Sequence, residues 1–167
     1  PAPELLSAST IADGVARGRL RAADVIDDAL DRIAALNPAL NALIEVRGPE
    51  ARAAAAALDA RVAAGEDVGP LAGVPLATKD VFWEAGVEAT NGSRSLVGFV
   101  PDETTVAIER LERAGAIVVG RSNVPEFCYR GHATNDLYGA TSNPWDLGRV
   151  PGGSSGGAGA AVAAGFV

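Results

Sequence analysis

Two adjacent serines lie inside a glycine-rich stretch, Pro151-Gly-Gly-Ser-Ser-Gly-Gly157. Glycine loses the most backbone entropy on folding, so a loop with four glycines in seven positions requires unusual dihedrals or a ligand close to the main chain. The small, uncharged residues 158–165 follow and predict a buried helix that begins at the loop. Free N–H groups at such a helix N-terminus favour an anion or a developing oxyanion. The stretch is therefore a candidate active site.

A serine hydroxyl is a weak nucleophile and needs a base within hydrogen-bonding distance. The favoured base is Lys79, which follows the mostly apolar stretch 71–78 and is predicted to end a strand, where open α/β sheets carry their chemistry. Burial disfavours a charged amine, and a neutral lysine can act as a general base. The alternative is a structural lysine that pairs with Asp80 or Glu126.

Two other chemistries fit the sequence less well. A Ser-His-Asp arrangement would have to use His132, the single histidine, which lies among turn residues, and the chain has no G-x-S-x-G elbow. A P-loop needs a Lys-Ser or Lys-Thr pair after its last glycine, whereas Gly157 is followed by Ala158 and Gly159. The dinucleotide-binding spacing of glycines after a strand is also missing. The lysine–serine pair remains the favoured interpretation.

Composition limits the class of protein. A chain of 167 residues is long enough for one domain with a hydrophobic core. No apolar run reaches the roughly 18–20 residues that cross a bilayer, and the first residues lack a signal-peptide pattern, so we expect a cytoplasmic protein. The net charge of −7 disfavours nucleic acids and anionic membranes as partners. The single cysteine, Cys128, excludes an internal disulfide and a multi-cysteine metal site.

Helices and strands alternate along the sequence. An amphipathic pattern predicts a helix over 22–36 that ends at Asn37-Pro38, with its acidic residues on a solvated face. Alternating Ala42, Ile44 and Val46 predict a strand over 40–46. The other expected elements are an alanine-rich helix at 49–64, an apolar strand that runs into Lys79, a helix capped by Asp102 and stopped by Gly115, and a buried strand at 116–120.

This order of elements predicts an α/β fold with a mixed central sheet flanked by helices. A change of composition near residue 69 divides a helical arm with one strand, residues 1–68, from the start of a catalytic core, residues 69–167, within one domain. Residues 121–150 carry few regular signals, and a long irregular stretch inside a compact domain is often functional. That stretch leads directly to the glycine-rich loop.

Five segments, in the same order, resemble the amidase signature family. They cover the chain from about residue 20 onward, and together they are far more specific than one glycine motif. The segments are Gly73-Val-Pro-Leu-Ala-Thr-Lys-Asp80, Ala114-Gly-Ala-Ile-Val-Val-Gly120, Asn123-Val-Pro-Glu-Phe127, Asn143-Pro-Trp-Asp146 and Pro151-Gly-Gly-Ser-Ser-Gly-Gly157. The resemblance implies the N-terminal part of the amidase-signature fold, with no cofactor, and nothing in the sequence resembles a metal site.

The resemblance also implies hydrolysis of carboxylic amides by a Ser-cisSer-Lys triad. Lys79 matches the family's base, and Ser154 matches the bridging serine, whose peptide bond to Gly153 is expected to be cis. Lys79 takes a proton from Ser154, which takes one from the nucleophile; an acyl-enzyme forms, ammonia or an amine leaves, and water releases the acid. Gly153, Ser155 and Cys128 are the expected substrate-binding residues. For Ser155 a role in holding the loop is the alternative, and for Cys128 inert packing.

The family's nucleophile has no counterpart in this sequence. It lies about two dozen residues beyond the bridging serine, in a second glycine-rich motif that also supplies oxyanion-hole amides, whereas this sequence ends at Val167. We therefore expect a truncated N-terminal part of an amidase that is inactive alone. Covalent catalysis is lost, and so is an oxyanion-hole contribution often worth about 3–4 kcal/mol.

Two branches of the family remain open. In the A subunit of the tRNA-dependent amidotransferase the matching segment reads Met-Asp-Glu-Phe-Ala-Met-Gly, and Pro125, Cys128, Tyr129 and Arg130 depart from it. These differences favour a stand-alone amidase that acts on a small-molecule amide. A truncated, non-catalytic binding module is a third interpretation. A homodimer is a further expectation.

Overall fold

The computed structural model describes residues 5–167, which form five α-helices and five strands. The helices are α1 (Ala8–Ala16), α2 (Ala22–Leu40), α3 (Gly48–Ala63), α4 (Val106–Arg113) and α5 (Gly156–Ala163). The strands are β1 (Leu43–Val46), β2 (Pro75–Lys79), β3 (Ile117–Ser122), β4 (Thr134–Asn135) and β5 (Gly139–Ala140). Two short 3-10 helices are η1 (Arg94–Leu96) and η2 (Glu126–Cys128). Among these helices none has the length and apolar character needed to cross a membrane.

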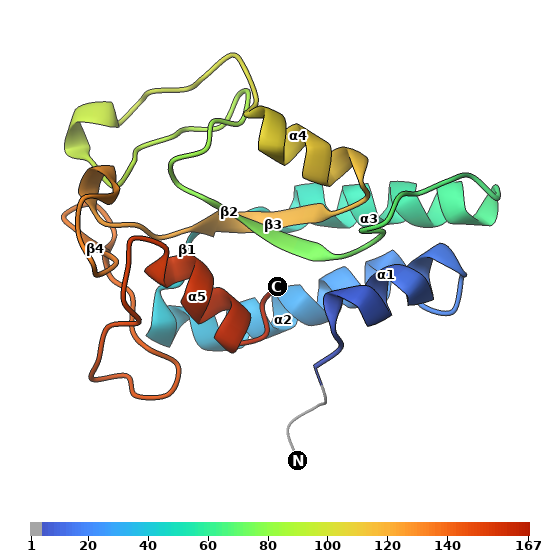
Figure 1. Cartoon of the computed structure of the whole chain (residues 1–167), viewed down its shortest axis with the longest axis horizontal. Helices are drawn as coiled ribbons and strands as arrows, with labels where there is room; N and C mark the ends of the chain where they lie inside the picture. Colours follow the sequence, from blue (N-terminus) through green and yellow to red (C-terminus); the bar gives the residue numbers. More distant parts are fainter. Residues whose placement is uncertain (1–4) are drawn as a thin grey trace.

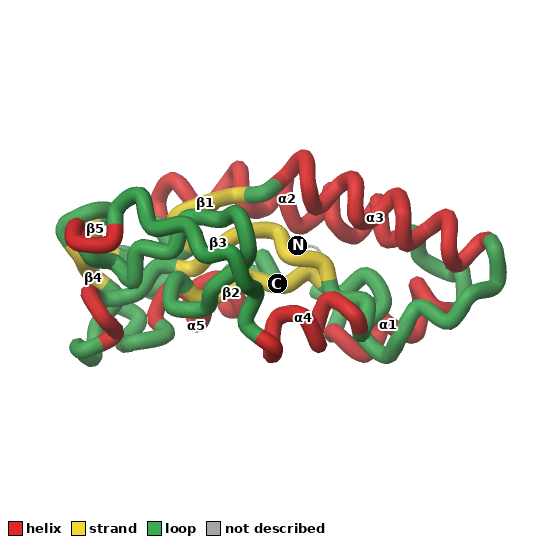
Figure 2. The backbone as a smooth tube through the Cα atoms, turned by 90° about the horizontal axis from the view of Figure 1, so that it is seen from above, coloured by secondary structure: helices red, strands yellow, loops and turns green. Residues whose placement is uncertain are grey.

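Three strands form the central sheet in the order β1-β3-β2 (Figures 1 and 2). β3 pairs antiparallel with β1 and parallel with β2, so the predicted mixed sheet is confirmed. At the carboxyl ends of the parallel strands, Lys79 is paired with Ser122 and Thr78 with Arg121. The predicted strand that runs into Lys79 is also confirmed.

Helices cover the sheet, and most of the loops gather at one of its ends. In the view of Figure 1, α4 lies above the sheet and α1, α2 and α5 lie below it, while the loops and the β4–β5 pair gather beyond one end of the strands. All six residues of β3 are buried, as expected for a central strand. One hydrophobic cluster joins both halves of the chain through residues such as Ile26, Leu43, Val119 and Phe166.

α2 continues past its predicted end at Asn37-Pro38 and reaches Leu40. Proline lacks the N–H of the helical ladder, but in the last turn this removes only one hydrogen bond. The Asn37 side chain supplies replacements: its Nδ2 donates to the Leu43 carbonyl (2.9 Å), and its Oδ1 accepts from the N–H groups of Ala42 (2.9 Å) and Leu43 (2.9 Å). The side-chain amide therefore stabilises the helix end that the proline alone would shorten.

Two other predicted features are wrong. β1 begins at Leu43, and its burial does not alternate as predicted, since Leu43 is buried while Val46 is half-exposed at the edge of the sheet. α4 begins after Thr105 and has no side-chain cap. Asp102 lies outside the helix, and the Thr105 hydroxyl accepts the N–H of Trp83 instead.

The alanine-rich helices form close to where the sequence predicts them. α3 ends just before Gly65, whose positive φ of 73° stops the helix. α5 begins at the glycine-rich loop and buries Ala160 and Ala161, but Val162 is 60% exposed. The prediction of a fully buried helix is therefore wrong for one face of α5.

The first turn of α5 packs directly on another backbone. A Cβ at Gly157 would lie 2.4 Å from the Asn123 nitrogen and 2.5 Å from its carbonyl oxygen. The Gly157 N–H donates to that same carbonyl (3.3 Å). Gly159 lies about half a turn further along the helix, and a Cβ there would have no neighbouring atom within 4 Å. These two glycines of α5 therefore have different surroundings. Gly157 lies against the backbone of Asn123, where a side chain would clash, whereas Gly159 has free space beside it.

We expect Gly157→Ala to destabilise the chain by about 1–3 kcal/mol, because the added methyl group overlaps backbone atoms that cannot move aside. Gly159→Ala is the matched control and should stabilise the chain by about 0.5–1 kcal/mol through helix propensity. Urea unfolding followed by circular dichroism measures both. Equal stability of the two variants would contradict the close packing of α5 on Asn123.

Candidate active site

Lys79 is the only lysine of the chain and lies partly exposed at the end of β2. Its Nζ donates hydrogen bonds to Ser154 Oγ (2.8 Å) and Ser155 Oγ (3.0 Å). The carboxylates considered as alternative partners are engaged elsewhere, Asp80 by Arg121 and Glu126 by Ser93. Within residues 5–167 no carboxylate lies at ion-pair distance from Lys79 Nζ. The amine therefore contacts two hydroxyl groups and no counter-ion.

The glycine-rich loop reaches Lys79 by lying against the main chain of residues 132–133. A Cβ at Gly153 would be 2.6 Å from the His132 nitrogen and 2.9 Å from its Cα, so only glycine allows this approach. The Ala133 N–H donates to the Gly152 carbonyl (3.1 Å). The peptide bond between Gly153 and Ser154 is cis. The backbone of His132 and Ala133 is thus the surface that positions the two serines.

Two buried asparagines attach that surface to the central sheet. Asn135 Nδ2 donates to Asn123 Oδ1 (2.8 Å) and to the Val124 carbonyl (2.7 Å). Asn123 Nδ2 donates to Thr141 Oγ1 (3.1 Å) and to the Gly139 carbonyl (3.2 Å). Buried polar groups need such partners, so the amides link β3 firmly to the β4–β5 pair. The sequence pattern predicts only turns in this region and gives no sign of either role.

Asp80 anchors the end of β2 immediately after Lys79. Its carboxylate is 1% exposed and accepts hydrogen bonds from Thr90 N (3.2 Å), Thr90 Oγ1 (2.6 Å) and Gly92 N (3.1 Å), besides an ion pair with Arg121 (2.6 Å). Successive residues of a strand face opposite sides of a sheet, so Thr78 and Asp80 face one side and Lys79 the other. Thr78 joins the same cluster through Glu84 (2.7 Å), so the cluster supports the strand end from the face opposite Lys79.

Arg121 is buried at the centre of this cluster, surrounded by carboxylates. Besides Asp80, Glu45 lies 3.8 Å from its Nε and Glu84 lies 4.0 Å from its Nη1, and Glu84 also pairs with Arg47 (2.5 Å). Burial raises the pKa of the Glu45 carboxyl, although the Arg121 charge acts in the opposite direction. Removing one partner of a buried pair leaves an uncompensated charge, so this network constrains the local structure strongly.

The remaining candidates have less well-defined surroundings. Cys128 is partly buried in η2, where its backbone (φ 56°) and that of Phe127 (φ 48°) are left-handed. The His132 side chain makes no hydrogen bond with a serine among residues 5–167, so the geometry gives the Ser-His-Asp interpretation no support. In the same residues no three His, Cys, Asp or Glu side chains gather as metal ligands.

The sequence matches the family described as Amidase over residues 24–167. The chain belongs to the amidase signature family. The α/β fold predicted from the resemblance is confirmed by solved structures of that family.

Its relatives are amidases and amidotransferase subunits. The chain is 46% identical over 158 residues to the A subunit of glutamyl-tRNA(Gln) amidotransferase from Acidothermus cellulolyticus, and the match covers 95% of this chain and 31% of that protein. A bacterial aryl acylamidase superposes with a TM-score of 0.92 at 35% identity, over 98% of this chain and 34% of its own. A protein of a vestigial complex that reveals the origins of an s-triazine catabolic enzyme gives 0.93 at 42% identity, over 97% and 36%. The chain thus spans about a third of the length of these relatives.

The single lysine allows a direct check of the site. With ¹³C-labelled lysine, we expect nuclear Overhauser contacts from the Lys79 ε protons to the β protons of Ser154 and Ser155, because Nζ lies 2.8 Å and 3.0 Å from their hydroxyl oxygens. Ser154→Ala provides the assignment control, since it changes one set of contacts only. Contacts to the side chain of Glu126 in place of the serines would show that Lys79 has the structural role instead.

The buried ion network behind Lys79 gives a second prediction. Asp80→Asn should lower the free energy of unfolding by about 3 kcal/mol, because the Arg121 charge loses its closest buried partner. Asp27→Asn is the matched control: Asp27 pairs with Arg52 (2.6 Å) at the surface, where both side chains are about half exposed. Its cost should stay below about 1 kcal/mol, because exposed ion pairs contribute little to stability. Equal costs in urea unfolding would contradict the special role of the Asp80–Arg121 pair.

Proposed function

We propose that this chain supplies the general base and the relay serine of an amide-hydrolysing site. The observation that carries the proposal is the contact of the Lys79 amine with Ser154 Oγ (2.8 Å), in a place without a carboxylate partner. A neutral amine can take a proton from a hydroxyl group at this distance. Membership of the amidase signature family supports amide hydrolysis as the reaction class.

The proposed reaction uses this chain for proton transfer. Lys79 takes the proton of Ser154 while Ser154 takes the proton of the nucleophilic hydroxyl, whose oxygen then bonds to the amide carbon. When the carbon–nitrogen bond breaks, the proton returns along the same route to the departing amine. Water then hydrolyses the acyl-enzyme ester. Because the nucleophile and the oxyanion-hole amides have no counterpart in these residues, the 167-residue chain should be inactive alone.

Three further residues are proposed to bind substrate or shape its site. Ser155 is exposed and holds a second hydrogen bond to Lys79 Nζ (3.0 Å), which restricts rotation of the amine. Gly153 is exposed beside it and keeps the loop on the backbone of His132. Cys128 is proposed to contact the acyl part of the substrate, as the resemblance to the amidase signature family implies.

A second function is favoured by the curated relatives. The 46% identity to the A subunit of an amidotransferase, over 95% of this chain, supports a glutaminase role, whereas the departures at Cys128, Tyr129 and Arg130 support a stand-alone amidase. Both functions use the same lysine and serine. Ammonia release from glutamine, compared with aryl and short aliphatic amides, separates them. A cytoplasmic location and a homodimer are parts of the stand-alone proposal, and sedimentation measures the latter.

The activity test is a chimera in which residues 1–167 replace the matching third of the bacterial aryl acylamidase. Lys79→Arg and Ser154→Ala should each lower amide hydrolysis by at least about 100-fold, because arginine cannot accept a proton and alanine cannot relay one. Ser9→Ala is the matched serine control, on the exposed start of α1, and should change the rate less than about twofold. The unmodified 167-residue chain should release no ammonia.

Hydrolysis that persists in the Lys79→Arg chimera at the unmodified rate would contradict the proposed base. Turnover by the 167-residue chain alone, abolished by the same substitution, would show that the chain carries its own nucleophile. Circular dichroism of each chimera separates loss of the base from loss of the fold.

A further inference from the structure

Ser155 places a second hydroxyl group beside Lys79, and the proposed amide hydrolysis moves no proton through it. Lys79 Nζ lies 2.8 Å from Ser154 Oγ and 3.0 Å from Ser155 Oγ. Ser154 is partly buried, whereas Ser155 is exposed at the start of α5. A hydroxyl group at hydrogen-bonding distance from an amine can pass its proton to that amine. Ser155 therefore combines a neighbouring base with access from solvent.

The Ser155 side chain points toward the amine and not toward its own helix. Ser155 is the N-cap residue of α5, where a serine oxygen commonly accepts an N–H group of the first turn. Within residues 5–167 it makes no such capping hydrogen bond, and its backbone (φ −91°, ψ 35°) is not in the extended form typical of a capping residue. The hydroxyl group is thus held by Lys79 alone among the described residues.

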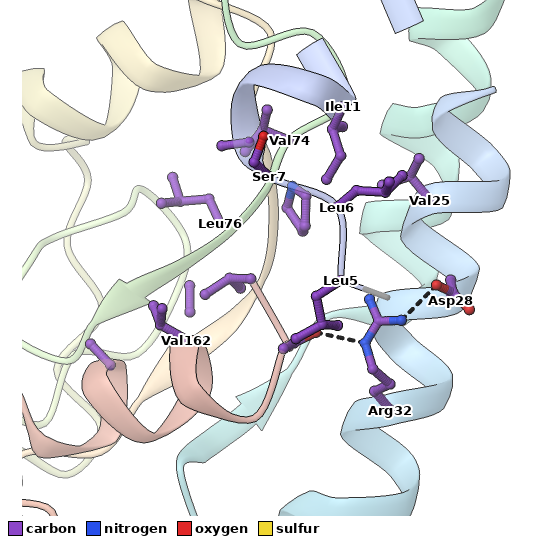
Figure 3. Close-up of a pocket in the computed structure, with 16 residues that line it drawn as sticks. Leu5, Leu6, Ser7, Ile11, Val25, Asp28, Arg32, Val74, Leu76 and Val162 are labelled. Atoms are coloured by element: carbon purple, nitrogen blue, oxygen red, sulfur yellow. Dashed lines mark hydrogen bonds and ion pairs between the residues drawn. The ribbon is translucent and has the colours of Figure 1, made fainter. Parts of the chain in front are cut away.

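Ser7 offers an internal comparison, because it has the same place at the start of α1. It is exposed, and its oxygen accepts the Thr10 N–H (3.1 Å) as an ordinary N-cap does. Ser7 also lines an apolar pocket of about 590 Å³ (Figure 3), so a small reagent can reach it. The basic side chain of this pocket is Arg32, whose guanidinium donates to the Asp28 carboxylate (2.5 Å) and cannot accept a proton. Ser7 therefore has access without a base.

We propose that Ser155 is a nucleophile for activated carboxylic esters, with Lys79 as its base. The Ser155 O–H bond breaks, and its proton moves to the neutral amine of Lys79. The electron pair left on the oxygen forms a bond to the ester carbonyl carbon. The bond between that carbon and the phenol oxygen then breaks, and a phenolate leaves with the electron pair. The lysine ammonium returns its proton to water, and Ser155 carries the acyl group as an ester.

This arrangement favours a phenyl ester over an amide. An amide nitrogen leaves only after it gains a proton, whereas a nitrophenolate leaves as an anion. Amide cleavage also depends on oxyanion-hole donors, which the family resemblance assigns to no residue of this sequence. Acylation of Ser155 rests on the same base as the proposed function, Lys79, but it uses neither the relay through Ser154 nor a nucleophile from elsewhere. The 167-residue chain can therefore be acylated and still release no ammonia from amides.

The test exposes the 167-residue chain to 4-nitrophenyl acetate and follows the release of 4-nitrophenolate and the mass of the protein. Peptide mapping should find an ester-linked acetyl group on Ser155, formed at least about 100-fold faster than on Ser7 of the same chain. Ser155→Ala should remove this label because the nucleophile is lost. Lys79→Arg should remove it because arginine does not accept the proton. Ser9→Ala, at an exposed serine of α1, is the matched control and should keep the label.

Neutral hydroxylamine cleaves an acetyl ester of serine and leaves an acetylated amine intact, so it separates Ser155 from Lys79 as the labelled residue. An acetyl group on Lys79 or Ser154 instead, equal labelling of Ser7 and Ser155, or full labelling of the Lys79→Arg chain would overturn the proposal. Circular dichroism shows whether each variant folds, and the comparison with Ser7 needs no variant. Amide hydrolysis by the chimera without acetylation of Ser155 contradicts only the ester proposal, and the reverse result contradicts only the proposed amide hydrolysis.

Discussion

The parallel pairing of β2 with β3 is the constraint on which the site depends. Parallel strands cannot be joined by a tight turn, so the chain between them must leave the sheet and return through α4. The pairing fixes Lys79 beside Ser122 and Thr78 beside Arg121. It also brings the segments that follow the two strands to the same end of the sheet. The loop with Gly92 and the segment after β3 meet there, where the Phe127 N–H donates to the Asn91 carbonyl (2.8 Å).

The two basic side chains at this strand end have different partners on the two faces of the sheet. On one face Arg121 is buried among carboxylates, with Asp80 at 2.6 Å, and its charge is compensated. On the other face the Lys79 amine contacts only hydroxyl groups within the described residues. Arginine gives the network a permanent charge, and its carboxylate partners compensate that charge.

Much of this arrangement could be predicted from the sequence, because apolar strands and small-residue helices have strong local signals. The strand that runs into Lys79 and the helix that begins at the glycine-rich loop are examples. The family resemblance then predicted that Lys79 and the loop belong to one site. The supporting residues could not be predicted. Asn123 and Asn135 lie in a stretch whose composition is typical of turns, and only the tertiary structure shows that their amides are buried. The role of Asn37 could not be predicted for the same reason. Its side-chain hydrogen bonds extend α2 beyond the expected end at Pro38, and only the folded structure shows them.

The contacts that position the lysine and the two serines all lie within these residues. Asp80 holds the strand end through Thr90 and Gly92, and the loop rests on the main chain of His132 through Gly153. The lysine and the two serines are therefore held in position by contacts of this chain alone. In the proposed reaction, the attacking group and the oxyanion-binding amides are the parts that the family resemblance assigns to no residue of this sequence, so the positioned base and relay are the part of the chemistry that this fold prepares.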